Sequence, residues 1–497
     1  MLSEYRQRFG AYHTEVNRED YLFRTGRKKN RETRQITGEY SDLFENSVVK
    51  ELGRLLKEVA DYRETERESI KRLISFAVRG NLAARVREVT EEIEALENSA
   101  QIDWIDWIDG IDGIDGEGRK IWFHQSAELL ANESDTLRRR ELAARRADVI
   151  KSAQDLRSER IAIMHEAARE FAYPHYAAMQ GELLGIDYQS LAGAAQAALS
   201  KSDSVYTSAL AQLLIGRAKC PIEEAVAADL GYLQRFDEFD VFFPPARMIE
   251  SYRALCAGLG FRSERQENVE LESGIRQGGE AFCAPLAVPE EIKLVSEMKG
   301  GQLNYREFLR AAGETQGYAW TSNNLSPEFC YPNDRALKAS WGMLFENLLL
   351  DGLWLQRNFG FMESESFRRV LAILRLMGVR GAAAKLDYEL EFHSGRLLGN
   401  AGLHYAETMT EAVRVGFDET GHLRYLSDYF QPADHLRACA LESQLREHLK
   451  SRFGLRWWDS RKAGEMLIDL WNTGERYTTE ELASLIGLGR LDFDWLA

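Results

Sequence analysis

Two pairs of reactive side chains stand four residues apart in the sequence, the interval that places side chains on one face of a helix. His435 and Cys439 lie in the segment HLRAC, and a cysteine beside a histidine can act as a nucleophile. No third group that would orient the histidine is evident, so ordinary packing remains an alternative. Arg310 and Glu314 form the other pair. They could bind a ligand, or simply form an ion pair with each other.

Further polar side chains accompany these pairs. Glu346 lies in the apolar segment WGMLFENLLL, where it could be a cleft residue or an ion-pair partner of Lys338 or Arg380. Tyr318 follows the Arg310–Glu314 pair, and an aromatic side chain there suits either a peptide ligand or ordinary packing.

The segments that must position these residues are mostly helical. Apolar residues recur every three or four positions, the helical period, in four long stretches: 47–100, 134–173, 367–393 and 433–453. No proline occurs before Pro174, which permits long helices. Short β-type runs occur only between the helical stretches, at 281–284 and 292–295. The sequence therefore predicts a mostly α protein with a small β element.

The chain divides into an N-terminal helical region, 1–150, and a longer region, 151–497. Within the first, residues 102–116 read IDWIDWIDGIDGIDG, a repeat of period three that fits neither helix nor strand. We expect a dispensable surface loop. A calcium or partner loop is the alternative, although the repeat lacks the spacing of known calcium loops. Its ligands would be Asp103, Asp106, Asp109, Asp112 and Asp115.

Charge and composition exclude several classes of protein. The 497 residues hold 63 Lys and Arg against 79 Asp and Glu, a net charge of −16, which argues against a nucleic-acid partner. No apolar run reaches the roughly 18 residues of a membrane span, and the first 20 residues do not resemble a secretory signal. Five scattered cysteines without a C-x-x-C motif indicate free thiols. We therefore expect a cytoplasmic protein.

Several blocks, in order, resemble the thimet-oligopeptidase and oligoendopeptidase F family of zinc metallopeptidases. The resemblance covers roughly 150–497 and is looser before that. It implies an oligopeptidase-like helical ellipsoid with a small β element and a deep central cleft. The blocks are 239–245 (FDVFFPP), 279–295, 304–320 (NYREFLRAAGETQGYAW), 339–355, 380–393, 424–442 and 449–458.

The resemblance fails at the zinc motif. In the family, H-E-x-x-H on a helix supplies two zinc ligands and a general base, and a downstream Glu completes the metal shell. The aligned residues here are Arg310, Ala311, Ala312, Gly313 and Glu314, and the downstream ligand falls at Ala339. The family's two catalytic tyrosines, which bind substrate and stabilise the oxyanion, align with Gln431 and His435.

The resemblance therefore implies a degenerate member: a catalytically inactive pseudopeptidase, without metal or other cofactor, that binds a peptide or protein partner in the old cleft. The alternative is zinc-independent chemistry on a small or peptidic substrate in that cleft. A new metal site built from Asp434, His435, Cys439 and Glu314 would require the two helices to meet as in the family. The candidate ligand-binding residues are Arg310, Glu314, Tyr318, Glu346, Gln431, His435 and Cys439.

Overall fold

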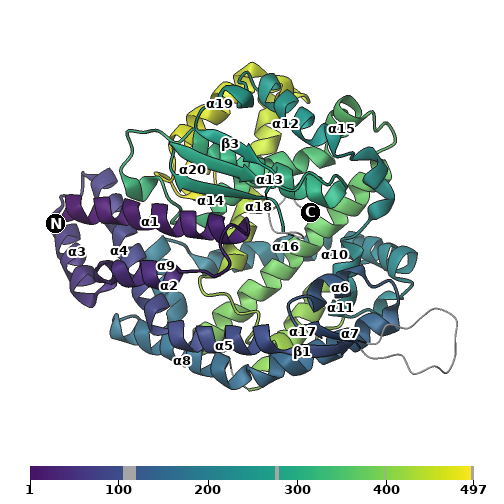
Figure 1. The fold of residues 1–497 in the computed structure, drawn as a ribbon, viewed down its shortest axis with the longest axis horizontal. Helices are drawn as coiled ribbons and strands as arrows, with labels where there is room; N and C mark the ends of the chain where they lie inside the picture. The colour runs from purple at the N-terminus through teal and green to yellow at the C-terminus, as the bar shows by residue number, and fades with distance from the viewer. Residues whose placement is uncertain (105–118, 275–278, 398, 494–497) are drawn as a thin grey trace.

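The computed structural model describes residues 1–104, 119–274, 279–397 and 399–493. The predicted mostly helical fold is confirmed, because helices account for most of these residues and strands for few (Figure 1). None of the helices within these ranges has an apolar stretch long enough to cross a membrane.

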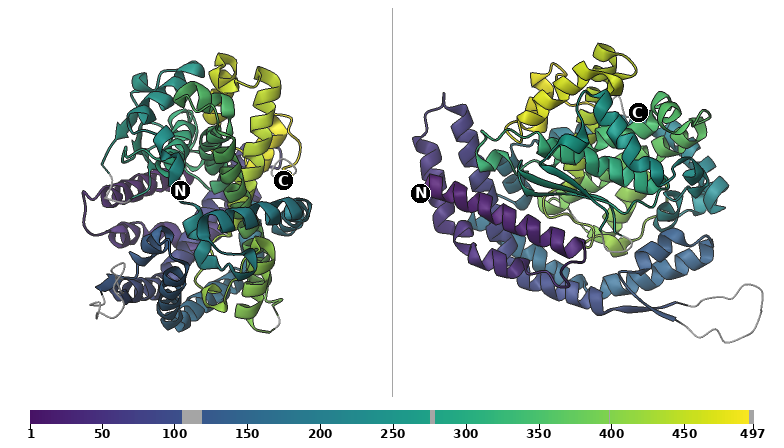
Figure 2. Two further views of the ribbon diagram at one scale, coloured as in Figure 1. Left: turned by 90° about the vertical axis from the view of Figure 1, so that its right-hand side faces the viewer. Right: turned by 45° about the horizontal axis from the view of Figure 1, so that its top comes forward.

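The first five helices form a curved outer layer (Figure 2). Apolar side chains of α1, α3 and α4 meet in one cluster that includes Phe9, Leu52 and Leu73. Helices therefore form in 47–100, where the helical period predicts them. The bounds are α1 Leu2–Arg24, α2 Thr33–Glu39, α3 Asn46–Glu58, α4 Glu64–Arg85 and α5 Arg87–Ser99.

A short antiparallel hairpin follows this layer. Its strands are β1 (Gln101–Trp104) and β2 (Arg119–Trp122). Ile102 is only 3% exposed and packs in a small cluster with Leu142 of α7. The expectation of a surface loop from residue 102 onwards is thus wrong for its first residues. Asp106, Asp109, Asp112 and Asp115 of the candidate calcium loop lie outside the described residues.

The next helices lead from the outer layer to the body of the molecule. The predicted boundary at residue 150 falls within α7 and remains a prediction. The helices are α6 Ser126–Asn132, α7 Thr136–Ser152, α8 Gln154–Glu170, α9 Tyr176–Leu184, α10 Tyr188–Leu213, α11 Ala227–Leu233 and α12 Ala246–Gly258.

The predicted β element is confirmed as a three-stranded sheet. β5 (Glu291–Val295) lies between β3 (Val269–Glu272), which is parallel to it, and β4 (Phe282–Ala287), which is antiparallel. Buried and partly exposed residues alternate along β4, as expected of a strand with one face on a core. Both β4 and β5 pack against α13 (Gln302–Ala319), and β4 also contacts α1.

The remaining helices form the core. α16, of 29 residues, runs diagonally through the molecule and contacts α10, α17 and α18 (Figure 1). α14 packs between α13 and α18, and ten of its twelve residues are buried. The bounds are α14 Arg335–Glu346, α15 Gly352–Phe359, α16 Glu365–His393, α17 Ala401–Val413, α18 Gln431–Phe453, α19 Arg461–Asn472 and α20 Thr479–Leu485.

Candidate functional site

Two glycines bring α13 and α14 into close contact. A Cβ added at Gly313 would lie 2.9 Å from the Cα of Gly342 and closer still to the carbonyl oxygen of Trp341. A Cβ at Gly342 would lie 2.9 Å from the carbonyl oxygen of Arg310. Only glycine permits this separation of the two helices, which places Arg310 and Glu314 directly against α14.

Arg310 forms its ion pair with Glu346, so the predicted pair with Glu314 is wrong. Its Nε and Nη2 lie 2.7 and 2.6 Å from Oε2 of Glu346, and Nε of Arg306 lies 3.2 Å from Oε1. Burial opposes ionisation of Glu346, but the two guanidinium groups outweigh it and hold the pKa of this carboxyl below its usual range. Each carboxylate oxygen of Glu346 thus faces an arginine.

The other partners predicted for Glu346 are engaged elsewhere. Lys338 lies 3.6 Å from a carboxylate oxygen of the buried Glu475, and Arg380 pairs with Asp203 at 2.7 Å. Arg306, one helical turn before Arg310, is the partner that the sequence analysis missed. Its position four residues before Arg310 is the signal that could have identified it.

Glu314 is the one acidic group among residues 310–314. Burial raises the pKa of this carboxyl to about 7, and nearby Arg310 and Arg24 offset the effect only in part. Ala311 and Ala339 offer no donor atom, and Arg310 brings a positive charge. Across the parts of the chain that the structure describes, no group of three or more His, Cys, Asp or Glu side chains could hold a metal ion. The residues at this position therefore do not fit zinc, which needs about three protein ligands.

α18 brings His435 and Cys439 together as their spacing predicts. Nε2 of His435 lies 3.6 Å from Sγ of Cys439, which also lies 3.7 Å from the Met343 sulfur. Burial opposes a thiolate, but His435 outweighs it and lowers the pKa of Cys439, while Cys439 raises the pKa of His435. Cys439 is only 1% exposed. Its sulfur therefore packs against the His435 ring and does not face a cavity.

Two predicted residues are buried among other side chains. Tyr318 is 7% exposed, and the Lys338 ammonium lies 4.5 Å from the centre of its ring. Asp434 is 9% exposed, and burial together with the nearby Asp334 raises its pKa to about 7. Neither residue lines the large cavity described next.

Gln431 and His435, at the start of α18, line a cavity of about 1050 Å³. The cavity also receives side chains from α7, α11, α16 and α17, and these helices lie near one another in Figure 1. Arg310, Glu314, Glu346 and Cys439 are not among its lining residues. The structure thus divides the predicted site residues into three groups: Arg310, Glu314, Tyr318 and Glu346 on α13 and α14, Gln431 and His435 on the cavity wall, and the buried Cys439 next to His435.

The sequence analysis missed the remaining lining residues. α7 contributes Arg140, Ala143, Ala144, Ala147 and Ile150, which recur at the helical period in RELAARRADVI. A stripe of small residues beside basic ones was the available signal, but such a pattern is equally typical of helix packing.

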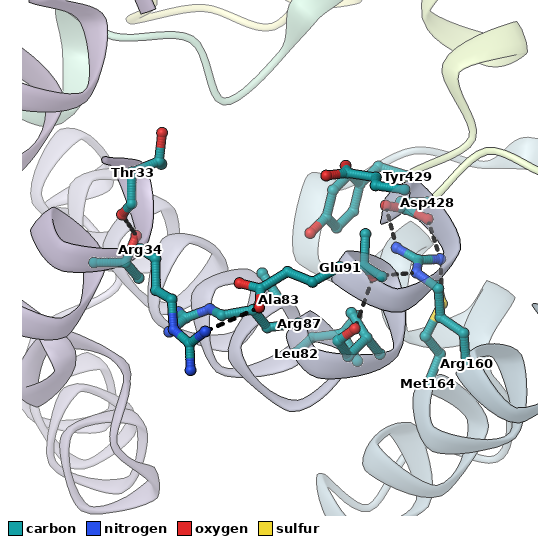
Figure 3. A pocket seen from close by; sticks show the side chains of 14 residues that line it. Thr33, Arg34, Leu82, Ala83, Arg87, Glu91, Arg160, Met164, Asp428 and Tyr429 are labelled. Atoms are coloured by element: carbon teal, nitrogen blue, oxygen red, sulfur yellow. Dashed lines mark hydrogen bonds and ion pairs between the residues drawn. The ribbon is translucent and has the colours of Figure 1, made fainter. Parts of the chain in front are cut away.

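A smaller pocket of about 300 Å³ lies between the outer helices and the loop before α18 (Figure 3). Its charged side chains are largely paired within the protein. Arg160 binds both carboxylate oxygens of Asp428 at 2.7 Å, and Arg34 lies 3.0 Å from Glu91. These groups are already satisfied, so the pocket offers less for a ligand than the larger cavity.

Comparison with known proteins supports the fold. No protein-family model matches the sequence, and no curated protein matches it significantly. Among solved structures, the chain is similar to the M32 carboxypeptidase of Deinococcus radiodurans R1, with a TM-score of 0.57 and 12% sequence identity. The match covers all of this chain and 96% of the carboxypeptidase. At this identity the likeness shows a shared peptidase-type helical fold and nothing finer.

Proposed function

We propose that this protein is a degenerate metallopeptidase: it does not hydrolyse peptides through zinc, and it binds a peptide, a small peptidic ligand or a protein partner in its cleft. The observation that carries the proposal is the ion pair between Arg310 and Glu346. By the sequence resemblance, Arg310 aligns with the first zinc-binding histidine of the oligopeptidase family. A fixed cation there opposes a second cation, and the neighbouring glycine contacts leave little room to rearrange.

The binding part of the proposal rests on the cavity at the start of α18. Gln431 and His435 stand where the family carries its substrate-binding tyrosines, and both side chains line the cavity. Amide and imidazole groups can donate and accept hydrogen bonds, as the peptide backbone requires. The cavity beside Gln431 and His435 is therefore the place that we propose for the ligand.

Rebuilding the zinc motif tests the proposal. The wild-type protein should contain no stoichiometric zinc by elemental analysis and should cleave no short fluorogenic peptide. The fourfold variant Arg310→His, Ala311→Glu, Glu314→His and Ala339→Glu should gain zinc, because two histidines at i and i+4 are the main local requirement.

The fourfold variant should still show little hydrolysis. One missing oxyanion donor typically lowers the rate by about 10²–10³, and both tyrosines are absent. Activity should rise only when Gln431→Tyr and His435→Tyr are added. Tightly bound zinc in the wild type, or efficient cleavage by the fourfold variant, would overturn the proposal of a catalytically degenerate cleft.

Binding is tested separately with non-hydrolysed peptides. Titration of a short-peptide library by native mass spectrometry should detect complexes with the wild type. Gln431→Ala should weaken them, while Gln189→Ala, an exposed glutamine that does not line the cavity, should not. Equal binding by both variants would place the ligand elsewhere.

Zinc-independent chemistry in the same cleft is the second candidate. The 3.6 Å contact between His435 and Cys439 favours it, whereas the burial of the thiol opposes a nucleophilic role. Iodoacetamide applied to the native protein distinguishes the two: rapid, selective labelling of Cys439 would support an enzyme, and protection until unfolding would support a binding protein.

A further inference from the structure

The large cavity exists because two facing helices carry small residues. α7 lines it with Ala143, Ala144 and Ala147, and α16 lines it with Gly378 and Ala382, with spacings that put each set on one helix face. Nothing larger than a methyl group extends from these positions. The volume of about 1050 Å³ is at the upper end of small-molecule sites.

Arg146 lines this cavity without an acidic partner. Its Nη1 donates to the carbonyl oxygen of Phe123 at 3.1 Å and to the hydroxyl of Ser126. The acid whose charge acts on its guanidinium, Glu97, forms its own ion pairs with Arg157 and Arg424, and no ion pair of Arg146 itself is found within the described residues. Burial lowers the pKa of Arg146, which reflects a charge that the surroundings do not fully compensate.

Lys385 contributes a second cation from α16. Its Nζ lies 3.8 Å from Oε1 of Glu389. That carboxyl is fully buried and accepts hydrogen bonds of 2.8 Å from both the amide and the hydroxyl of Ser427. Burial raises the pKa of Glu389 to about 7, so near neutral pH it only partly balances Lys385.

Among the described lining residues, Asp418 is the one carboxylate, against the three cations Arg140, Arg146 and Lys385. The carboxylate of Asp418 accepts the backbone amide of Thr420 at 2.7 Å, as a helix cap. Arg140 lies 3.4 Å from Asp229, which is also held by the buried Arg139. The cavity therefore combines apolar walls with an excess of positive charge.

We infer that the cavity binds an amphipathic anion, with its apolar body along the alanine and glycine walls and its carboxylate or phosphate group at Arg146 and Lys385. The inference rests on the proposed function, because it names the class of ligand for the cavity that Gln431 and His435 line. An anion would supply negative charge beside Arg146 and Lys385. Its hydrogen bonds to these cations would be charge-assisted, and such bonds are about twice as strong as neutral ones.

Fluorescence titration with cis-parinaric acid, an apolar chain that ends in a carboxylate, tests the ligand class. The acid should bind the wild type, and its neutral methyl ester should bind at least about tenfold more weakly, as expected for the loss of one charged hydrogen bond. Competition by dodecyl phosphate would show whether phosphate serves as well as carboxylate. Equal affinity for acid and ester would overturn the inference.

Matched variants locate the head group. Arg146→Met and Lys385→Met should each raise the Kd of the acid about tenfold, while Lys151→Met, an exposed cation of α7 outside the cavity, should leave it unchanged. Ala147→Phe should reduce binding of acid and ester alike by filling the cavity. Unchanged affinity in all three cavity variants would overturn the assignment, and if a variant fails to fold, the comparison of acid and ester on the wild type still decides.

The result is separable from the proposed function. Failure of the acid to bind, with peptide complexes still formed, would refute the amphipathic anion and leave the proposed peptide binding intact. Zinc-dependent hydrolysis by the wild type would refute the loss of catalysis, whatever the acid titration shows.

Discussion

The cluster on α13 and α14 and the cavity beside α7 and α16 differ in packing and in charge pairing. In the cluster, glycines bring two helices together and two arginines share one carboxylate, Glu346. In the cavity, small residues keep space open, and Glu97, the acid near Arg146, is paired with Arg157 and Arg424 instead. The comparison teaches that unpaired charge and unfilled volume identify a ligand site better than the alignment of a residue with a family motif does.

Substitutions of glycine by alanine should change the free energy of unfolding most, and they test the difference between the two regions directly. Gly313→Ala should lower the free energy of unfolding by about 3 kcal/mol or more, because its Cβ would overlap the backbone of α14. Gly381→Ala, on the cavity wall, should raise it by about 0.5–1 kcal/mol, since the nearest atom lies 3.9 Å away and alanine favours helix. Urea unfolding measures both. Similar effects at the two positions would remove the contrast between a closed and an open helix contact.

Removal of the charge on Glu346, the carboxylate that two arginines share, should have the second-largest effect on stability. Glu346→Gln should lower the free energy of unfolding at pH 7 by about 1.5–3 kcal/mol, the value of hydrogen bonds to charged groups. Because the folded pKa of Glu346 is lowered, its contribution is present above its unfolded pKa of about 4.3 and is lost as the pH falls below it. The difference between variant and wild type should therefore shrink under acid conditions.

Glu465→Gln is the control for this prediction. Its carboxylate forms an exposed i,i+4 pair with Arg461, and such pairs contribute little. Equal losses from both substitutions would show that the buried network has no special role.

Glu314 should show the opposite pH dependence. Its folded pKa is raised to about 7, so between about pH 4.3 and 7 the unfolded carboxyl ionises while the folded one stays protonated. The wild type therefore loses stability as the pH rises through this range. Glu314→Gln should be more stable than the wild type by about 1–3 kcal/mol at pH 8 and nearly equal to it at pH 4. Thermal unfolding at the two pH values checks this, and a constant difference would contradict the burial of an uncompensated carboxyl.

The hairpin on α7 gives the smallest expected effect. Removal of all of 102–116 would delete the buried Ile102, so the dispensable segment has to begin at 105. Trp104 pairs directly with Arg119, and an Asn-Gly turn in place of 105–118 would close this hairpin. The Tm and the affinity for cis-parinaric acid should then stay nearly unchanged. A large loss of either would show that the replaced segment supports α7 and the cavity.

Much of the fold followed from local patterns. The helical period placed the long helices of 47–100, 367–393 and 433–453, and the β runs at 281–284 and 292–295 became β4 and β5. The third strand of this sheet, Val269–Glu272, was not predicted. Its sequence VELE alternates apolar and polar residues, but a run of four is a weak signal, and its strand conformation depends on pairing with β5.

The candidate site was predictable only within single helices. The contact between His435 and Cys439 followed from a spacing of four, which the helix itself enforces. The partner of Arg310 did not follow from spacing. Glu314 lies four residues away on the same helix, whereas Glu346 lies on another helix and could not be identified by local spacing. The separation of α13 from α14, set by Gly313 and Gly342, put Glu346 within reach instead.

The sequence by itself determined the helical class of this protein and the small sheet, since these depend on residue type and short-range period. The tertiary structure alone decided which charges are neutralised and where space remains open. Ion pairing and cavities depend on distances between helices far apart in the sequence, as Arg146 of α7 and Lys385 of α16 show on the walls of one cavity.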